Sequence, residues 1–220
     1  MARPVAWVRA RLAAGDELPF WFVFEPWLAP LLDDVVDPAA VPIEVELSHC
    51  KVTIDACRRI ARRASRVVEL RLEEVSTDDG LASLLPADAV WSSLRSVSID
   101  ECEEAAWLIP RLVASRIPEL ASLSITQSFD ARLLTDAPWL RTLEHLEVRS
   151  IDLAWLVARD LPRLVELSAE LDSDDDLATS LRRLVDRARR PRLARIRLKR
   201  LSADVVLPTM DGLEIVRAPG

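Results

Sequence analysis

The strongest constraint on this chain is a short pattern that recurs along most of its length. The pattern is an apolar residue, two variable residues, a second apolar residue, one variable residue and a third apolar residue. Six copies begin at positions spaced 27, 26, 23, 21 and 29 residues apart. They cover 67–72, 94–99, 120–125, 143–148, 164–169 and 193–198, and weaker copies cover 42–47 and 210–215. A period of this length predicts a stack of similar small units.

Each copy has the alternation expected of a short strand with one buried face. A strand of six residues is not stable alone, so we expect the copies to pair side by side in one parallel sheet. The segments between copies provide the return path, and several of them have helical periodicity and capping residues. We expect helices after Thr53, Thr77, Asp152 and Ser173. Prolines that stop the return path stand two residues before a leading Leu, at Pro118, Pro162 and Pro191.

With these features, residues 42–217 resemble the leucine-rich repeat family. The family consensus carries Asn or Cys three places after the last strand Leu, and Cys50 and Cys102 fall at that place. Val75, Ile151 and Leu201 depart from it, which predicts irregular turns. The resemblance implies an α/β solenoid, a horseshoe with a parallel sheet on its concave face and helices or loops on its convex face. The array would span 41–220 in about eight repeats.

The first 40 residues differ from the array and hold six of the 11 aromatic residues. We expect 1–40 to form a helical cap over the end of the array, with a helix over 5–14, since solenoid ends need such covers. An aromatic docking surface is the alternative. Residues 23–28 (VFEPWL) loosely resemble a short aromatic helix motif of bacterial repeat-companion domains, which precede leucine-rich repeats.

Composition narrows the class of protein further. The net charge of −7 argues against a general surface for nucleic acid or anionic membrane. The longest apolar stretch, 18–24, is too short to span a bilayer, and arginines at 3, 9 and 11 leave no clean export signal. Three cysteines at wide spacing do not make a disulfide framework, so a reducing cytoplasm is the expected location.

Candidate chemistry is scarce along the chain. His49 and His145 have no second ligand at zinc-site spacing, and no phosphate-binding glycine loop or nucleophile motif occurs. We therefore expect no metal, no cofactor and no catalytic residues, and structural roles for the three cysteines. An acidic run over 172–176 precedes an arginine-rich run over 182–192, and pairing of the two along a solvated helix face is expected. Four tryptophans near repeat junctions are expected in the core, namely Trp91, Trp107, Trp139 and Trp155.

The remaining candidate site is the polar face of the sheet. If the fourth and sixth residues of each copy point inward, the third, fifth and seventh residues line the concave surface. The expected partner-binding residues are Glu44, Glu46, Glu69, Arg71, Glu73, Ser98, Asp100, Ser124, Thr126, His145, Glu147, Arg149, Arg195, Arg197 and Lys199. The first copies are mainly acidic, the middle ones are small and neutral, and the seventh is basic. Either any soluble sheet face is polar in this way, or the charges select a partner.

These features predict a non-enzymatic module that binds an unknown protein partner through the concave face, as a monomer and without nucleic acid or membrane. An enzyme with a site at the repeat loops and a purely structural spacer remain the alternatives. The basic copy allows two interpretations of its own. Glu166 and Glu170 on the preceding copy neutralise Arg195, Arg197 and Lys199, or these cations hold an acidic peptide or a phosphate.

Overall fold

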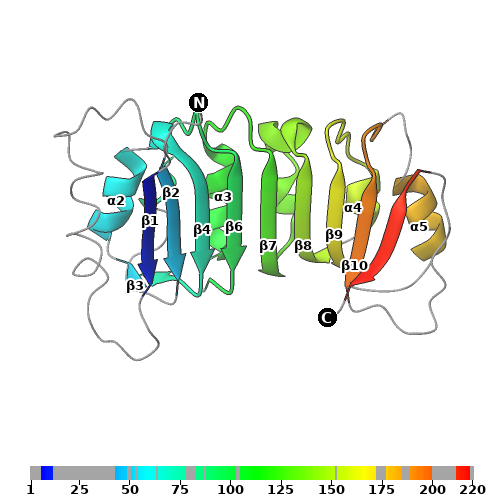
Figure 1. Cartoon of the computed structure of the whole chain (residues 1–220), viewed down its shortest axis with the longest axis horizontal. Coiled ribbons are helices and arrows are strands. Elements are labelled where there is room, and N and C mark those ends of the chain that lie inside the picture. Colours follow the sequence, from blue (N-terminus) through cyan, green and yellow to red (C-terminus); the bar gives the residue numbers. More distant parts are fainter. Residues whose placement is uncertain are drawn as a thin grey trace. The chain divides into compact units, whose positions relative to one another are not determined.

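A computed structural model describes residues 6–11, 43–48, 51–52, 54–62, 64–77, 83–86, 88–102, 105–151, 153–171, 177–184, 189–199 and 212–218. The chain forms two compact units, unit 1 up to Glu119 and unit 2 from Leu120 (Figure 1). The aromatic segment 20–27, His49, Cys50, the acidic run 172–176 and most of the expected cap lie outside the described residues.

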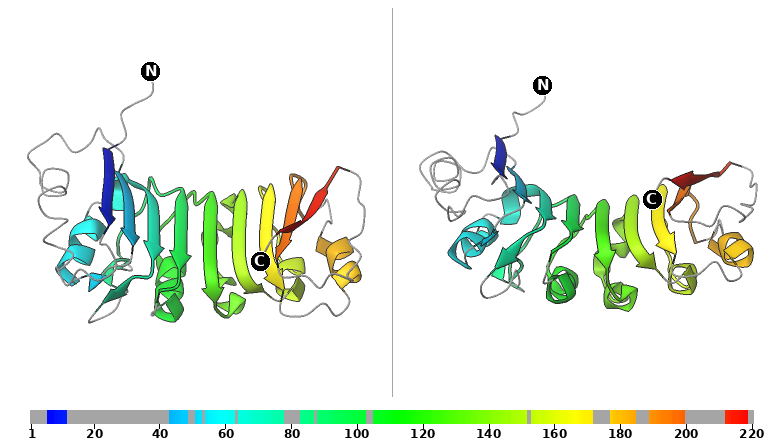
Figure 2. Two further views of the ribbon diagram at one scale, coloured as in Figure 1. Left: turned by 60° about the horizontal axis from the view of Figure 1, so that its bottom comes forward. Right: turned by 90° about the horizontal axis from the view of Figure 1, so that it is seen from below.

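Unit 1 is a parallel sheet with helices on one face. Its strands are β1 (Ala6–Arg11), β2 (Ile43–Ser48), β4 (Val67–Glu73) and β6 (Ser96–Asp100), in the order β1-β2-β4-β6. Helices α2 (Ile54–Arg62) and α3 (Ala105–Ala114) lie against the sheet on the same side (Figure 2), and the short helix η2 (Ala64–Arg66) leads into β4. Two short strands, β3 (Lys51–Val52) and β5 (Ser76–Thr77), pair separately in parallel.

Unit 2 repeats this arrangement. Its strands are β7 (Ser122–Ser128), β8 (His145–Ile151), β9 (Glu166–Leu171), β10 (Arg195–Lys199) and β11 (Glu214–Ala218), paired in sequence order. Helices α4 (Leu153–Val157) and α5 (Leu177–Leu184) cover one face (Figure 2). Two 3₁₀ helices, η4 (Ala131–Leu134) and η5 (Pro138–Thr142), fill the return from β7 to β8. Both units are therefore α/β, with open parallel sheets in which each sequence copy supplies one strand and unit 1 has β1 in addition.

The register confirms the predicted alternation. In unit 2, Leu123, Leu146, Leu167 and Ile196 stand opposite one another on successive strands, and all four are buried. These residues are the fourth positions of their copies. In unit 1 the sixth positions Leu47, Leu72 and Ile99 form an equivalent buried row. Burial of these rows under the helices is the main apolar stabilisation of each sheet.

The predicted helix over 5–14 is wrong across Ala6–Arg11. This segment is strand β1, and it pairs in parallel with the whole of β2. The small apolar residues Ala6, Val8 and Ala10 alternate with larger side chains at positions 7, 9 and 11. This period of two suits a strand. The edge of β2 offers backbone partners along its full length, and these compensate a weak apolar pattern.

The other local predictions concern four helices and the register of the last sequence copy. The helices expected after Thr53, Asp152 and Ser173 are confirmed as α2, α4 and α5, whereas α3 was not anticipated. The helix expected after Thr77 would begin among undescribed residues. In the last copy the pairing is displaced by two residues, so that Ile215 rather than Leu213 stands opposite Ile196. A displacement of two preserves which face each residue occupies.

Trp107 corrects the expectation that four tryptophans are core residues. Trp91, Trp139 and Trp155 are buried, but Trp107 is 73% exposed on α3. The buried residues of α3 are Leu108, Ile109 and Leu112, which define the helix face that packs on the sheet. Trp107 lies outside this face, so its indole projects away from the core.

The arginine-rich run after α5 also departs from its expected role. Arg190 is fully buried, and its guanidinium donates hydrogen bonds to the backbone oxygens of Leu156, Val157 (3.2 Å), Arg159 (2.7 Å) and Leu184 (3.1 Å). Leu156, Val157 and Leu184 lie in the last turns of α4 and α5, where helix carbonyls lack internal donors, and Arg159 lies two residues beyond α4. Arg190 therefore fastens two helix ends together, whereas the sequence pattern indicated a solvated charge.

The turn after β6 contains the cysteine that matches the repeat consensus. The Cys102 thiol is buried and donates to the backbone oxygen of Asp100 over 3.4 Å. Burial raises the pKa of the Cys102 thiol. A buried thiol with a raised pKa is a poor nucleophile, in keeping with a structural role.

None of the helices in the described part of the chain has the length and apolar character needed to cross a lipid bilayer.

Candidate functional site

The face of each sheet opposite its helices is called the open face below. In unit 1 the open face carries Glu44, Glu46, Ser48, Glu69, Arg71, Glu73, Ser96, Ser98 and Asp100, which the strand register aligns in rows. In unit 2 it carries Ser122, Ser124, His145, Glu147, Arg149, Glu166, Ser168, Glu170, Arg195, Arg197, Lys199 and Glu214. The predicted site residues thus share a face within each unit, because residues two apart in a strand point the same way.

Thr126 is the exception among the predicted residues. A β-bulge interrupts the pairing of β7 with β8 after Ile125, so that Arg149 stands opposite Ser128. Thr126 contributes instead through its backbone oxygen, which accepts a hydrogen bond from Nη1 of Arg149 over 3.3 Å. Irregular pairing of this kind is common at strand ends, and the sequence pattern contains no direct signal for this one.

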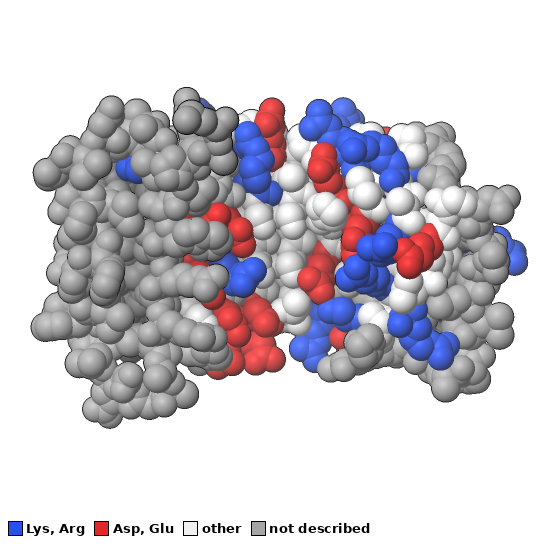
Figure 3. Space-filling model, in the orientation of Figure 1, with Lys and Arg blue, Asp and Glu red and all other residues white. Residues whose placement is uncertain are grey.

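The open face of unit 1 is mainly acidic. Among the described side chains of β2, β4 and β6, five carboxylates accompany one guanidinium, that of Arg71, and red side chains predominate over β4 and β6 in Figure 3. Arg71 lies 3.6 Å from Glu69, and the Ser48 hydroxyl donates to Glu73 over 3.1 Å. The backbone register also places Arg9 of β1 opposite Glu46. Sequence reasoning missed this arginine, because the first 40 residues were assigned to a separate cap.

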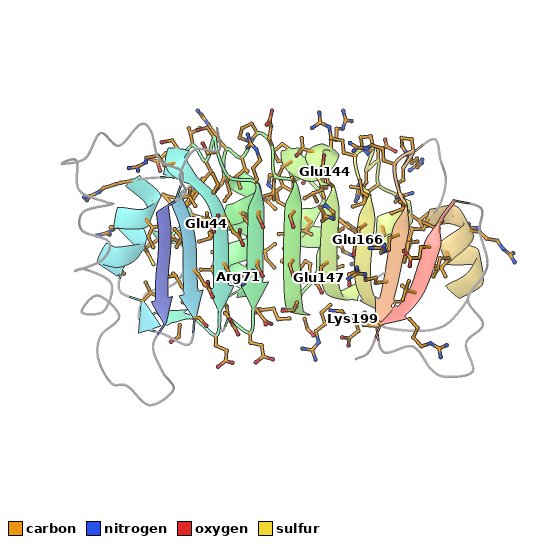
Figure 4. The ribbon with its side chains drawn as sticks, in the orientation of Figure 1. Glu44, Arg71, Glu144, Glu147, Glu166 and Lys199 are labelled. Atoms are coloured by element: carbon orange, nitrogen blue, oxygen red, sulfur yellow. The ribbon has the colours of Figure 1, made fainter. Side chains whose placement is uncertain are left out.

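Unit 2 carries an ordered set of charge pairs on its open face. Nζ of Lys199 on β10 lies 2.6 Å from Oε1 of Glu147 on β8, and the two side chains face each other across β9 (Figure 4). The Ser124 hydroxyl donates to Oε2 of Glu147 over 2.9 Å. Ser168 occupies the position between Glu147 and Arg197 on β9, and its small side chain leaves room for the Lys199 chain to cross.

The neighbouring rows hold further pairs. Nε of Arg197 lies 3.0 Å from Oε1 of Glu166, and Arg195 lies between Glu166 at 3.7 Å and Glu214 at 2.6 Å. Nε of Arg149 lies 3.4 Å from Glu170. The expectation that Glu166 neutralises the basic strand is therefore met for Arg195 and Arg197. Lys199 pairs with Glu147 rather than with the expected Glu170, because it reaches past the adjacent strand.

The contacts of Glu147 determine the direction in which its pKa is shifted. Partial burial opposes its ionisation, but hydrogen bonds from Lys199 and Ser124 and the positive charges of Lys199 and Arg197 outweigh it, so the pKa of Glu147 is lowered. A carboxylate with a lowered pKa is a weak base and gives little activation to the adjacent Ser124 hydroxyl. The arrangement therefore favours a fixed ionic surface over nucleophilic chemistry.

His145 lies exposed on β8, between Ser122 on β7 and Glu166 on β9 in the strand register. Among the described residues, no three His, Cys, Asp or Glu side chains are grouped so that they could hold a metal ion.

No protein-family model matches the chain, and no curated protein and no solved structure shows significant similarity to it.

Proposed function

We propose that the chain is a leucine-rich repeat protein that binds another protein through the open faces of its sheets. The observation that carries this proposal is the alignment of polar side chains in rows on sheet faces that the described helices leave uncovered. The strand in every sequence copy and the buried Cys102 at the consensus position support the family assignment. A horseshoe curvature follows from that assignment.

Small side chains on the open faces support a binding role. Ser98 in unit 1 and Ser122 in unit 2 are partly exposed and project little above their sheets. A partner can approach the backbone closely at such positions. A reducing, cytoplasmic setting also fits, because Cys57 and Cys102 are buried as thiols and form no disulfide.

Steric probes test this proposal one unit at a time. Ser98→Tyr and Ser122→Tyr each add a bulky neutral side chain to one open face, and tyrosine is well tolerated in strands. Matched controls are Ser65→Tyr and Arg163→Tyr, at exposed positions outside the strands of units 1 and 2. We expect at least one open-face variant to lose a protein that the wild type captures from cell extract, while both controls retain it.

Two outcomes would count against the proposal. Capture that survives both open-face variants places the binding surface elsewhere. Turnover in a broad hydrolase screen that His145→Ala abolishes would favour an enzyme in place of a binding module.

A further inference from the structure

The carboxylates of β8 and β9 in unit 2 are already engaged by cations. Glu147 receives Lys199 on one oxygen and Ser124 on the other. Glu166 faces Arg197 with Oε1 and Arg195 with Oε2, and Glu170 faces Arg149. These acceptors therefore have little capacity left for a partner that brings positive charge.

The arginines of β10 keep spare donors. A guanidinium has five N–H groups. Arg197 contacts Glu166 through Nε, and its two terminal nitrogens make no hydrogen bond within the described part of the chain. Arg195 uses Nε and Nη1, which leaves Nη2. On β10, therefore, donor groups of two exposed arginines remain available to a partner.

The exposed fractions of the side chains also indicate that the arginines of β10 are accessible to a partner. The side chains of Arg195 and Arg197 are 41% and 45% exposed, whereas that of Glu166 between them is 23% exposed. The carboxylate lies beneath and holds the guanidinium groups outward. A molecule that approaches β9 and β10 therefore meets these two guanidinium groups before the carboxylate of Glu166, although cations and carboxylates alternate across the strands (Figure 3) and the Glu214 side chain beside Arg195 is 55% exposed.

The strand geometry sets the spacing of these cations. Arg195, Arg197 and Lys199 alternate with the buried Ile196 and Leu198, so they project from one face at intervals of roughly 7 Å. An extended peptide has the same interval between alternate side chains. The positions that flank Arg197 in its row are Ser168 and Val216, which carry no charge and compete for no ligand.

We infer that the open face of unit 2 binds an extended acidic peptide segment that lies along β10. Carboxylates at alternate positions of the peptide accept from the outward N–H groups of Arg195 and Arg197, and a third lies above the ammonium of Lys199. Charge-assisted bonds to arginine give such a contact direction as well as attraction. This inference rests on the proposed function and names the partner's chemistry at one of its two faces.

Binding of defined peptides to the full chain tests the inference. The probe is a fluorescently labelled ten-residue peptide with Glu at alternate positions and Ser between them, followed by anisotropy. One comparison peptide has Gln in place of Glu, and another has the same composition with its Glu residues in one block. We expect the alternating Glu peptide to bind most tightly, the block peptide more weakly and the Gln peptide not measurably.

Arginine variants locate the contact. Arg197→Gln and Arg195→Gln should each weaken the alternating peptide by about tenfold and flatten the dependence of its affinity on salt. Arg192→Gln is the matched control, because Arg192 is also exposed and lies 3.7 Å from Glu144, outside the open face. The affinity of the Arg192→Gln variant for the alternating peptide should equal that of the wild type. Unchanged circular dichroism confirms that each variant is folded.

Several results would overturn the inference. Equal binding of the Gln peptide, or an equal loss in Arg192→Gln, removes the specific role of β10. Arginine-dependent binding of pyrophosphate or of an oligonucleotide, without binding of the acidic peptide, assigns the surface to phosphate ligands. If Ser122→Tyr abolishes capture of a cellular partner but no acidic peptide binds, the proposed function stands and this inference alone fails.

Discussion

Arg190 illustrates how a single side chain can complete two helices at once. Its buried guanidinium donates to the carbonyl of Leu184 at the end of α5 over 3.1 Å, and to that of Arg159, two residues beyond α4, over 2.7 Å. Carbonyls in the last turn of a helix have no donors within that helix, and burial removes water as a substitute. Lysine does not match this geometry, since its ammonium is a point donor on a flexible stem.

We expect Arg190→Ala to lower the free energy of unfolding by about 3 kcal/mol or more, because several buried acceptors lose a charged donor. Arg190→Lys should recover only part of this loss. Arg192→Ala is the control, and it should cost about 0–1 kcal/mol, as an exposed ion pair does. Urea denaturation followed by circular dichroism measures all three. Similar midpoints for Arg190→Ala and Arg192→Ala would contradict the buried role.

Glu147 gives the second prediction at the scale of the residue. Its pKa is lowered in the folded chain, so its contribution to stability is present above the ordinary glutamate pKa of about 4.3 and is lost as pH falls through the folded value. Glu147→Gln should therefore be less stable than the wild type at pH 7, by about 1 kcal/mol for a half-exposed pair. The difference should shrink as the pH is lowered toward 3.

Urea midpoints between pH 7 and pH 3 check this prediction. Lys199→Met, added to Glu147→Gln, should cost little more than the first substitution alone, because the pair is already broken. Wild-type and Glu147→Gln curves that stay parallel over the whole range would show that the Lys199 contact does not act on stability.

At the scale of the element, the alternation within each copy was sufficient to locate eight strands and to assign their faces. Val97 and Ile99 of β6 are buried, for example, while Ser96 and Ser98 between them are partly exposed. Strand β1 escaped prediction because its sequence also fits one face of a helix, and α3 because Pro110 interrupts the usual helical pattern. The Lys199–Glu147 pair escaped because it depends on a side chain that crosses a whole strand.

Leu146 tests the strand register directly. It is buried in β8, in the row formed with Leu123 and Leu167. Leu146→Ala should lower the free energy of unfolding by about 2–5 kcal/mol. Leu146→Asp should prevent folding, because the carboxylate would be buried without a partner. His145→Ala, one residue away on the open face, should stay within about 0.5 kcal/mol of the wild type. Thermal unfolding that is unchanged in Leu146→Asp would refute the register.

At the scale of the whole molecule, the copies differ in length while the strands keep their pairing. Starts of successive copies lie 21 to 29 residues apart, yet within each unit neighbouring strands pair in parallel along most of their length. The return segments absorb the difference: the return from β6 to β7 contains the ten-residue helix α3, and the return from β8 to β9 contains the five-residue helix α4. The spacing between copies therefore did not predict the structure of the return segments, whereas the apolar pattern within each copy did predict the strands.

Insertions should be tolerated in the return segments and not within the strands. We expect Gly-Ser inserted between Ser128 and Phe129, where β7 ends, to cost less than about 1 kcal/mol, since loop closure depends weakly on length. A single Gly inserted between Leu146 and Glu147 should be far more damaging, because it turns the rest of β8 over. Melting temperatures of the two variants give the comparison. Equal losses would mean that the return segments are as strictly specified as the strands.

The order of strands in each unit has a consequence for how the protein is made. In unit 2 every strand from β8 to β10 bonds to the copy just before it and the copy just after it in the chain. The pairing of β8, β9 and β10 therefore depends on no segment that is distant in the sequence. Each new copy that leaves the ribosome finds its neighbour already synthesised, so the sheet can grow from its first strand onward while translation continues.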